Sequence, residues 1–278
     1  MSIGIPSQAM IVPIVPADVP TLPLAADSRF TPDTLAQHLA RYPHLAFRLV
    51  GGQDYALGGY WHRRPEIGLL LEVASQEQRP ALVERLLAAY RQAGARLVVL
   101  AEGEAEQALD FYRQIGFDVL EEVIPYERPP CRVEPLSPRL ALRPLAEDDL
   151  PALVALEEQA FPWLWWETAE SFWEAAQRPG RWAYTAWRGG DLVGYLILAQ
   201  RGDFGHINRI AVHPSWQGQG YGAELLTYAI SALARHGAQR VGLNTQSNNT
   251  RSQRLYERFA FQRTGERYWF YGLWLEER

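Results

Sequence analysis

One stretch decides the fold of this chain: Ile207-Asn208-Arg209-Ile210-Ala211-Val212-His213-Pro214-Ser215-Trp216-Gln217-Gly218-Gln219-Gly220-Tyr221-Gly222. Its apolar first half is typical of a buried strand, its three glycines of a tight turn, and the apolar periodicity from Ala223 onward of a helix. Glycines leave the backbone N–H groups of the turn uncovered, and the helix start adds unpaired N–H groups and the positive end of its dipole. The stretch therefore predicts an anion seat suited to a phosphate or a pyrophosphate.

The composition limits the kinds of protein that this chain can be. Its 278 residues, 47% of them hydrophobic, are enough for one large or two ordinary domains. A net charge of −5 argues against nucleic-acid binding, and all 27 basic residues are arginine. The single cysteine, Cys131, excludes an internal disulfide and a cysteine metal cluster, and we expect no metal site. The apolar runs are too short for a membrane span and the N-terminus lacks a basic secretion signal, so we expect a cytoplasmic protein without membrane contact.

The chain shows the same sequence pattern twice. Residues 12–22 line up with residues 143–153 at an offset of 131, and residues 111–117 line up with residues 255–261 at an offset of 144. The matches between them are Gly59-Tyr60 with Gly194-Tyr195 and Gly94-Ala95 with Gly237-Ala238, at offsets of 135 and 143. Ordered matches with a slowly growing offset indicate one fold used twice, with small insertions in the second copy.

Each copy alternates short apolar strands with helices, which favours an α/β (α+β) fold. In the first copy we predict strands at 46–50, 55–60, 67–73, 96–101 and 119–126, with helices at 80–93 and 104–115. The second copy repeats this order between residues 140 and 275. A proline-rich connector separates the copies, so we expect two domains, 1–128 and 139–278, joined by a linker at 129–138.

The two copies differ at the glycine-rich turn. Between Val212 and Ala223 the second copy has ten residues, whereas the first copy has six between Val73 and Pro80. None of these six, residues 74–79, is glycine. We therefore expect the first copy to be unable to seat a phosphate and to be structural or substrate-shaping.

Two motifs of the second copy resemble a known family. Gln217-x-x-Gly220-x-Gly222 at a strand-to-helix turn resembles the pyrophosphate motif of the GCN5-related N-acetyltransferases, the GNAT superfamily. Downstream, Asn249-x-x-Ser252-x-x-Leu255-Tyr256-x-x-x-Ala260-Phe261 resembles the second motif of that family, with small residues replacing its usual alanine at 252 and glycine at 260. The likeness covers residues 140–275 directly and residues 10–126 through the internal repeat.

The resemblance implies the architecture of the chain. It indicates two tandem GNAT-type acyl-CoA N-acyltransferase domains, each with a mixed, mostly antiparallel sheet flanked by helices. Tandem members of this superfamily exist, mycothiol synthase being the best-known type. The first domain is then a degenerate copy and the second the catalytic one.

The resemblance also implies that the cofactor is coenzyme A, bound as acetyl-CoA. Its pantetheine amides are expected on the backbone of the strand end, and its pyrophosphate on the N–H groups of the turn. For Asn249, a helix-capping role is the alternative to a cofactor contact. The expected cofactor-binding residues are Ile210, Ala211, Val212, Gln217, Gly218, Gln219, Gly220, Tyr221, Gly222, Asn249 and Ser252.

Tyr256 and His206 are the expected catalytic residues. Tyr256 stands where the family has a tyrosine that hydrogen-bonds the cofactor sulfur and protonates the departing thiolate; the alternative is a core tyrosine like Tyr112. His206 lies six residues before Val212, the position where, by the resemblance, histone-type members carry a glutamate base, and a neutral imidazole can take a proton near pH 7. Its alternative is a hydrogen-bonded histidine at a strand start. Asn244 falls where ribosomal N-terminal alanine acetyltransferases have a catalytic glutamate, and an amide cannot act as that base.

The aromatic segment 161–173 falls, by the resemblance, beside the amine entrance. We take Trp163, Trp166 and Glu167 as candidate substrate contacts. Tryptophan faces suit apolar or cationic groups, and they equally suit packing against the first copy. The segment thus leaves open which of its rings face the acceptor.

We interpret the chain as an N-acetyltransferase that moves an acetyl group from acetyl-CoA to a primary amine of a small molecule or a peptide N-terminus. Direct transfer in a ternary complex is expected, because Cys131 lies in the connector and no other cysteine can carry an acyl-enzyme. A non-catalytic acyl-CoA-binding sensor or scaffold is the alternative, and a second acyl-CoA in the first copy is another. A monomer or a homodimer is compatible with the sequence.

Overall fold

The computed structural model describes residues 10–129 and 138–275, and the chain forms two compact units. The first unit holds residues up to Leu120 together with those from Trp269 onward, and the second unit holds Glu121–Tyr268. Cys131 and most of the expected linker lie outside the described residues. Among the helices of the described ranges, none combines the length and the apolar character that crossing a bilayer requires.

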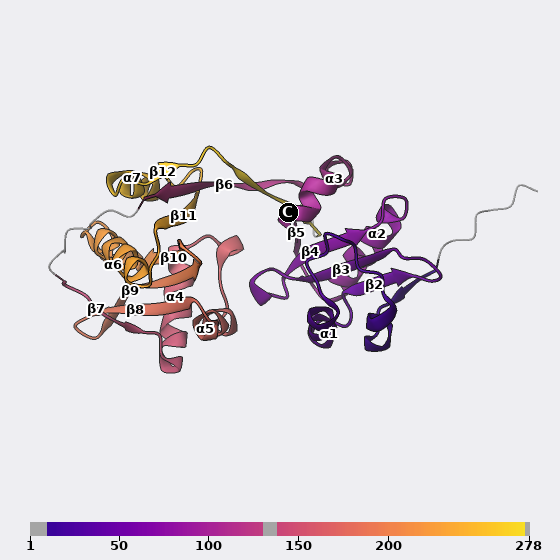
Figure 1. The fold of residues 1–278 in the computed structure, drawn as a ribbon, viewed down its shortest axis with the longest axis horizontal. Helices are drawn as coiled ribbons and strands as arrows, with labels where there is room; N and C mark the ends of the chain where they lie inside the picture. Colours follow the sequence, from indigo (N-terminus) through magenta and orange to yellow (C-terminus); the bar gives the residue numbers. More distant parts are fainter. Residues whose placement is uncertain (1–9, 130–137, 276–278) are drawn as a thin grey trace, which may run out of the picture. The chain divides into compact units, whose positions relative to one another are not determined.

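The first unit is a mixed sheet with helices on both faces (Figure 1). Its strands follow the order β1-β2-β3-β4-β5-β13, in which β4 and β5 are parallel and the other pairs described are antiparallel. Leu35 and Leu39 of α1 pack on one face, and apolar residues of α2 and α3 pack on the other. The elements are β1 (Ile11–Pro13), α1 (Pro32–Arg41), β2 (Ala46–Leu49), β3 (Tyr55–Tyr60), β4 (Ile67–Ala74), α2 (Arg79–Gln92), β5 (Leu97–Leu100), α3 (Glu102–Gln114) and β13 (Tyr268–Trp274).

The second unit repeats this plan (Figure 1). Its strands follow the order β7-β8-β9-β10-β11-β6, β12 pairs with β6, and only β10 and β11 among these described pairs are parallel. The helix α6 and Tyr256 of α7 belong to the core on one face, and α4 and α5 to the core on the other. The elements are β6 (Asp118–Arg128), β7 (Ala141–Pro144), α4 (Leu150–Ala160), α5 (Ala169–Gln177), β8 (Arg181–Arg188), β9 (Asp191–Arg201), β10 (Phe204–Val212), α6 (Tyr221–Arg235), β11 (Arg240–Gln246), α7 (Thr250–Arg258) and β12 (Gln262–Arg263).

The strand registers confirm that the two units are copies of one fold. The parallel pairing ends at Leu70↔Leu100 in the first unit and at Ile207↔Leu243 in the second. One residue later, a bulge interrupts the antiparallel ladder on the other side of the same strand, at Leu71 in β4 and at Asn208 in β10. Positions can therefore be matched by register, and Glu72 of β4 corresponds to Arg209 of β10.

The last strand of each copy completes the sheet of the other unit. The end of β6 pairs with β11 from Val123↔Gln246 to Arg128↔Val241, inside the second unit. Conversely, β13 at the end of the chain pairs with β5 of the first unit from Gly272↔Val99 to Trp274↔Leu97. The compact units therefore differ from the continuous ranges 1–128 and 139–278 expected from the sequence, because an apolar strand pattern does not specify which sheet it joins.

Candidate functional site

A fork opens in the sheet of the second unit where β10 and β11 separate. The pairing of these strands ends at Ile207↔Leu243, but β10 continues along β9 to Val212↔Gly194. The N–H group of His213 donates to the Val193 carbonyl at 2.8 Å, which turns the backbone groups of odd-numbered residues in this part of β10 toward β9. Ile210 and Val212 therefore present backbone groups to the fork, whereas those of Ala211 pair with β9. An extended ligand with amide groups can add there as a strand does.

The anion seat, residues 217–222, directly follows the fork. Gly218 and Gly220 have φ of 82° and 87°, a left-handed conformation that side-chain-bearing residues seldom adopt. Gly220 is the N-cap of α6, and among the described residues no side chain caps this helix. The Gln217 amide donates to the Val212 carbonyl at 3.0 Å and so links the seat to the fork. The turn is thus built to leave N–H groups at the helix start available to an anion.

Three arginines surround the anion seat, which the sequence did not reveal. The guanidinium carbon of Arg139 lies 4.4 Å from the centroid of the Tyr221 ring, and Arg188 donates to the hydroxyl of the same tyrosine. Arg251, in the first turn of α7, donates to the Gln217 side-chain oxygen at 2.5 Å. These residues come from three separate segments, so no local sequence motif predicts that they lie near the anion seat. Arg139 also pairs with the Glu224 carboxylate at 3.3 Å, so the charges of Arg188 and Arg251 contribute most of the attraction for a polyanion that the arginines add to the helix dipole.

His206 lies on β10, where the strand still pairs with Gly242 of β11, one position before the fork. Burial lowers the pKa of its imidazole, hydrogen bonds with the side chains of Asn208 and Asn244 oppose that effect, and the charge of Arg181 lowers the pKa further. The ring is therefore neutral at pH 7 and can accept a proton. Burial also lowers the pKa of Arg181, the Arg178 charge adds to this, and the Glu167 carboxylate opposes it. Arg181 thus interacts electrostatically with both His206 and the predicted acceptor residue Glu167.

Tyr256 is buried in α7, with its ring 6.1 Å from those of Tyr126 and Phe261. Burial raises the pKa of its phenol to about 12, a hydrogen bond with the Ser252 side chain opposes this, and Tyr126 adds to it. The phenol is therefore protonated throughout the neutral range and is a hydrogen-bond donor there, not a base. Asn249 is the N-cap of α7, and its side-chain oxygen accepts from the Ser252 N–H at 3.2 Å. The helix-capping alternative for Asn249 is the role that the contacts display.

The first part of the aromatic segment, residues 161–167, is called the acceptor segment below. It contains a short 3₁₀ turn, Trp163–Trp165, between α4 and α5. Trp163, Trp166 and Glu167 are all half-buried. The indole N–H of Trp166 donates to the Phe161 carbonyl at 2.8 Å, which closes the turn on itself. The three candidate substrate residues thus lie within or next to one hydrogen-bonded turn.

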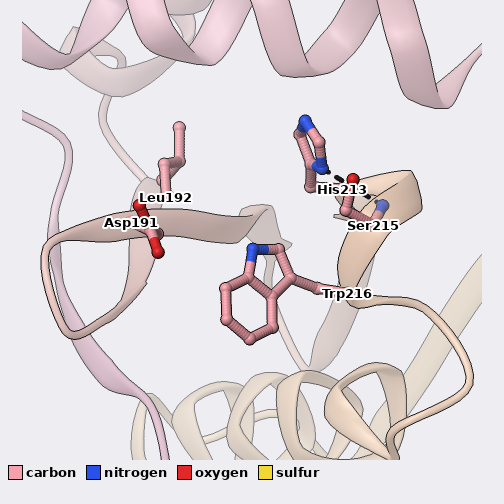
Figure 2. Close-up of a pocket in the computed structure, with 5 residues that line it drawn as sticks. All are labelled: Asp191, Leu192, His213, Ser215 and Trp216. Atoms are coloured by element: carbon pink, nitrogen blue, oxygen red, sulfur yellow. Dashed lines mark hydrogen bonds between the residues drawn. The ribbon is translucent and has the colours of Figure 1, made fainter.

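A pocket of about 360 Å³ lies where the β8–β9 turn meets the segment before the anion seat (Figure 2). It is lined by Asp191, Leu192, His213, Ser215 and Trp216. The Ser215 N–H donates to Nδ1 of His213 at 3.2 Å, which holds the imidazole against the turn. Figure 2 shows the Trp216 indole directed between the two chain segments. The pocket gives the neighbourhood of the seat a concave, partly aromatic surface.

The matching fork of the first unit is filled by its own side chains. The Val73 N–H donates to the Glu104 carboxylate at 2.8 Å, and Arg79 donates to the Val73 carbonyl at 3.1 Å. Arg79 and Glu104 form a buried ion pair, and the Tyr112 hydroxyl donates to Glu104 at 2.5 Å. Burial is the main cause that raises the pKa of Glu104, against which Tyr112 and Arg79 act. The loop before α2 has only residues 75–78, against residues 213–220 before α6, which confirms the difference of four residues read from the sequence.

Comparison with known proteins identifies the fold and its family. Residues 142–261, which include the fork and the anion seat, match the acetyltransferase (GNAT) family. The whole chain resembles a tandem GNAT protein from the clavulanic acid biosynthesis pathway, with a TM-score of 0.60 and 14% identity over 98% of this chain and 100% of that one. Residues 142–261 therefore match the GNAT family, and the whole chain shares the fold of a tandem GNAT protein.

Two further comparisons agree with that match. A GNAT structure from Sphaerobacter thermophilus has a TM-score of 0.63 at 18% identity, covering 99% of this chain and 98% of that one. A putative ribosomal protein bS18 alanine N-acetyltransferase of Bacillus subtilis is 27% identical over 137 residues, which are 49% of this chain and 89% of that protein. The resemblance and the α/β fold expected from the sequence are thereby confirmed.

Proposed function

We propose that this protein transfers an acetyl group from acetyl-CoA to a primary amine, with the second unit as its working site. The observation that carries the proposal is the direct succession of fork and anion seat along β10 and the start of α6. A ligand whose amide groups are followed by a pyrophosphate fits this arrangement, with the amides at the fork and the pyrophosphate at the anion seat. Coenzyme A has this chemistry.

The residues of the second unit fit this cofactor. Ile210 and Val212 would bind the pantetheine amides through their backbone, and the N–H groups of residues 217–222 would bind the pyrophosphate. Arg139 and Arg251 supply positive charge beside the seat. When bound, acetyl-CoA supplies an acetyl group activated as a thioester.

The chain's own residues then handle protons and orientation. His206 accepts the proton that the amine loses, because its neutral ring lies next to the fork. Tyr256 would donate a hydrogen bond to the cofactor sulfur, because its phenol remains protonated. Holding amine and thioester together contributes most, with effective molarities of roughly 10⁵–10⁸ M for well-placed partners. Direct transfer remains our proposal, since Cys131 is the only cysteine of the chain.

An α-amine, of a small molecule or of a peptide N-terminus, is the acceptor class that we propose. At pH 7 an α-amine with a pKa near 8 is about a tenth neutral, whereas a lysine amine is under roughly 0.1% neutral. A single neutral imidazole is a weak base, so it suits the acceptor that already loses its proton readily. The names of the Bacillus subtilis relative and of an Escherichia coli relative, 29% identical over 119 residues, refer to an alanine of ribosomal protein bS18.

The test is an amine panel with acetyl-CoA. Purified protein is mixed with acetyl-CoA and amino acids, aminoglycosides, polyamines, cysteinyl pseudodisaccharides or peptide N-termini, and free thiol release is followed together with the product mass. We expect amine-dependent release with at least one α-amine and a product heavier by one acetyl group. Tight acetyl-CoA binding without transfer to any amine would contradict the proposal and favour an acyl-CoA sensor or scaffold.

A further inference from the structure

We propose that Arg209 is the positioning residue that holds the acceptor segment, residues 161–167, against the fork; this rests on the proposed acetyl transfer. Arg209 follows the bulge at Asn208 on β10, and only 12% of its side chain is exposed. Its guanidinium donates to the Trp165 carbonyl at 2.5 Å and pairs with the Glu157 carboxylate. One side chain therefore joins the strand that forms the fork to the segment expected at the amine entrance.

Glu157 of α4 makes this attachment firm. The carboxylate is fully buried, and besides Arg209 it accepts from the Tyr195 hydroxyl on β9 and from the Glu167 N–H at 3.3 Å. A buried carboxylate is stable only when it is paired and hydrogen-bonded, so these donors constrain one another. The network fixes α4, β9 and the far end of the acceptor segment to one point.

Arg209 also contacts the near end of the segment. Its guanidinium carbon lies 4.3 Å from the centroid of the Phe161 ring, within the range of a cation–π contact. Arg209 thus contacts the segment at Phe161 and at Trp165, and its partner Glu157 accepts from the N–H of Glu167. Arginine suits this task because a planar guanidinium can bind a carboxylate and a carbonyl through its edge and an aromatic ring through its face. A lysine ammonium has no such planar face and fewer donors.

In the first unit the position after the bulge also carries a charged side chain that binds a neighbouring segment, but its charge is negative. Glu72, which corresponds to Arg209 by register, accepts from the Tyr55 hydroxyl at 2.5 Å. The register also shows that Tyr55 corresponds to Tyr195, so the match of Gly59-Tyr60 with Gly194-Tyr195 expected from the sequence is wrong. The Glu72 carboxylate also accepts from the Ser28 hydroxyl at 3.0 Å and from the Arg29 N–H at 3.2 Å. These two residues directly precede α1 and its N-cap, on the face of the sheet that α4 and α5 cover in the second unit. The position after the bulge therefore anchors a surface segment in both copies, but only in the second unit is that position followed by the anion seat.

Because both units have an anchor at this position, the two anchors can be compared to distinguish a positioning role from a purely structural role. Losing either anchor removes side-chain hydrogen bonds, most of them partly buried, and should lower stability. Only loss of the Arg209 anchor should change how the acceptor is held, because a displacement near 1 Å can reduce a rate by roughly 10²-fold. Glu72 is therefore the matched control for Arg209.

The experiment compares Arg209→Gln, Arg209→Lys and Glu72→Gln with the wild type in the full-length chain. Acetyl-CoA affinity is measured by calorimetry, hydrogen exchange is followed in residues 161–167, and steady-state kinetics use the best amine of the panel. For Arg209→Gln we expect faster exchange in that segment and a fall of roughly 10²-fold in kcat/KM for the amine, with acetyl-CoA affinity within about twofold of wild type. Arg209→Lys should recover part of the loss, and Glu72→Gln should lower the melting temperature without changing these kinetics.

Two results would overturn the positioning role. One is an Arg209→Gln variant that turns over the amine as the wild type does, and the other is a Glu72→Gln variant with the same kinetic loss. If Arg209→Gln does not fold, as judged by its near-ultraviolet circular dichroism, the comparison of Arg209→Lys with Glu72→Gln decides in the same way. A wild type that binds no acetyl-CoA would instead refute the proposed function, together with any positioning role that serves it.

Discussion

The left-handed conformation of Gly220 gives the sharpest quantitative test of the anion seat. With φ of 87°, an alanine at this position carries a strain of about 1–2 kcal/mol. Its Cβ would also lie 3.2 Å from a guanidinium nitrogen of Arg139. The variant relieves this strain by turning residue 220 out of the left-handed region, which moves N–H groups of the turn away from the anion. Restoring the seat on binding then costs about 1–2 kcal/mol, so we expect Gly220→Ala to weaken acetyl-CoA binding about 5- to 30-fold.

Gly237→Ala is the matched control at the other end of α6. Gly237 has φ of 94°, and an added Cβ would meet only the Gln200 side chain, at 4.0 Å. Both variants should lose similar stability, on the order of 1 kcal/mol, or a few degrees in melting temperature for a protein of this size. Calorimetric titration with acetyl-CoA and thermal unfolding measure the two effects separately. Unchanged affinity in Gly220→Ala, or equal weakening in both variants, would refute the reasoning.

Other predictions test the catalytic residues and the first unit. Because the pKa of His206 is lowered, the neutral base is present above that pKa and lost as the pH falls, so kcat should show an acidic limb below pH 6.5 that disappears in His206→Gln; a persisting limb would exclude this base. Tyr256→Phe should lower kcat and leave acetyl-CoA affinity unchanged in calorimetry, and undiminished turnover would remove its role. Arg79→Ala should cost about 3–5 kcal/mol in urea unfolding, because it leaves Glu104 buried without its partner, yet acetyl-CoA affinity should not change. Deleting β13 removes the strand that pairs with β5, so the shortened chain should lose the cooperative unfolding of the first unit in circular dichroism, and a native melting curve would contradict the strand exchange.

The local elements and the seat could be predicted from the sequence because their signals are local. The expected strand at 55–60 and helix at 80–93 are found as Tyr55–Tyr60 and Arg79–Gln92. The period of the apolar residues depends on whether the element is a strand or a helix, and not on which sheet it packs against, so it can be read from the sequence alone. The glycines of the seat are equally local, since Gly218 and Gly220 are needed where φ is positive.

The features that the sequence did not reveal are all contacts between distant segments. Three arginines from distant parts of the chain lie around the anion seat, namely Arg139, Arg188 and Arg251. Their spacing in the sequence does not predict this arrangement. The partners of Arg209 lie on α4, on β9 and in the acceptor segment, so its role depends on a sheet register that only the fold reveals. The exchange of β6 and β13 has the same origin, because both strands satisfy their apolar pattern in either sheet.

We propose that only the second unit of this chain binds acetyl-CoA. Calorimetric titration of the full chain with acetyl-CoA tests it most directly. We predict one acetyl-CoA per chain, with affinity reduced by Gly220→Ala and unchanged by substitutions at Arg79, because the first unit fills its own fork with Arg79 and Glu104. Two equivalents per chain, or no binding at all, would contradict the account.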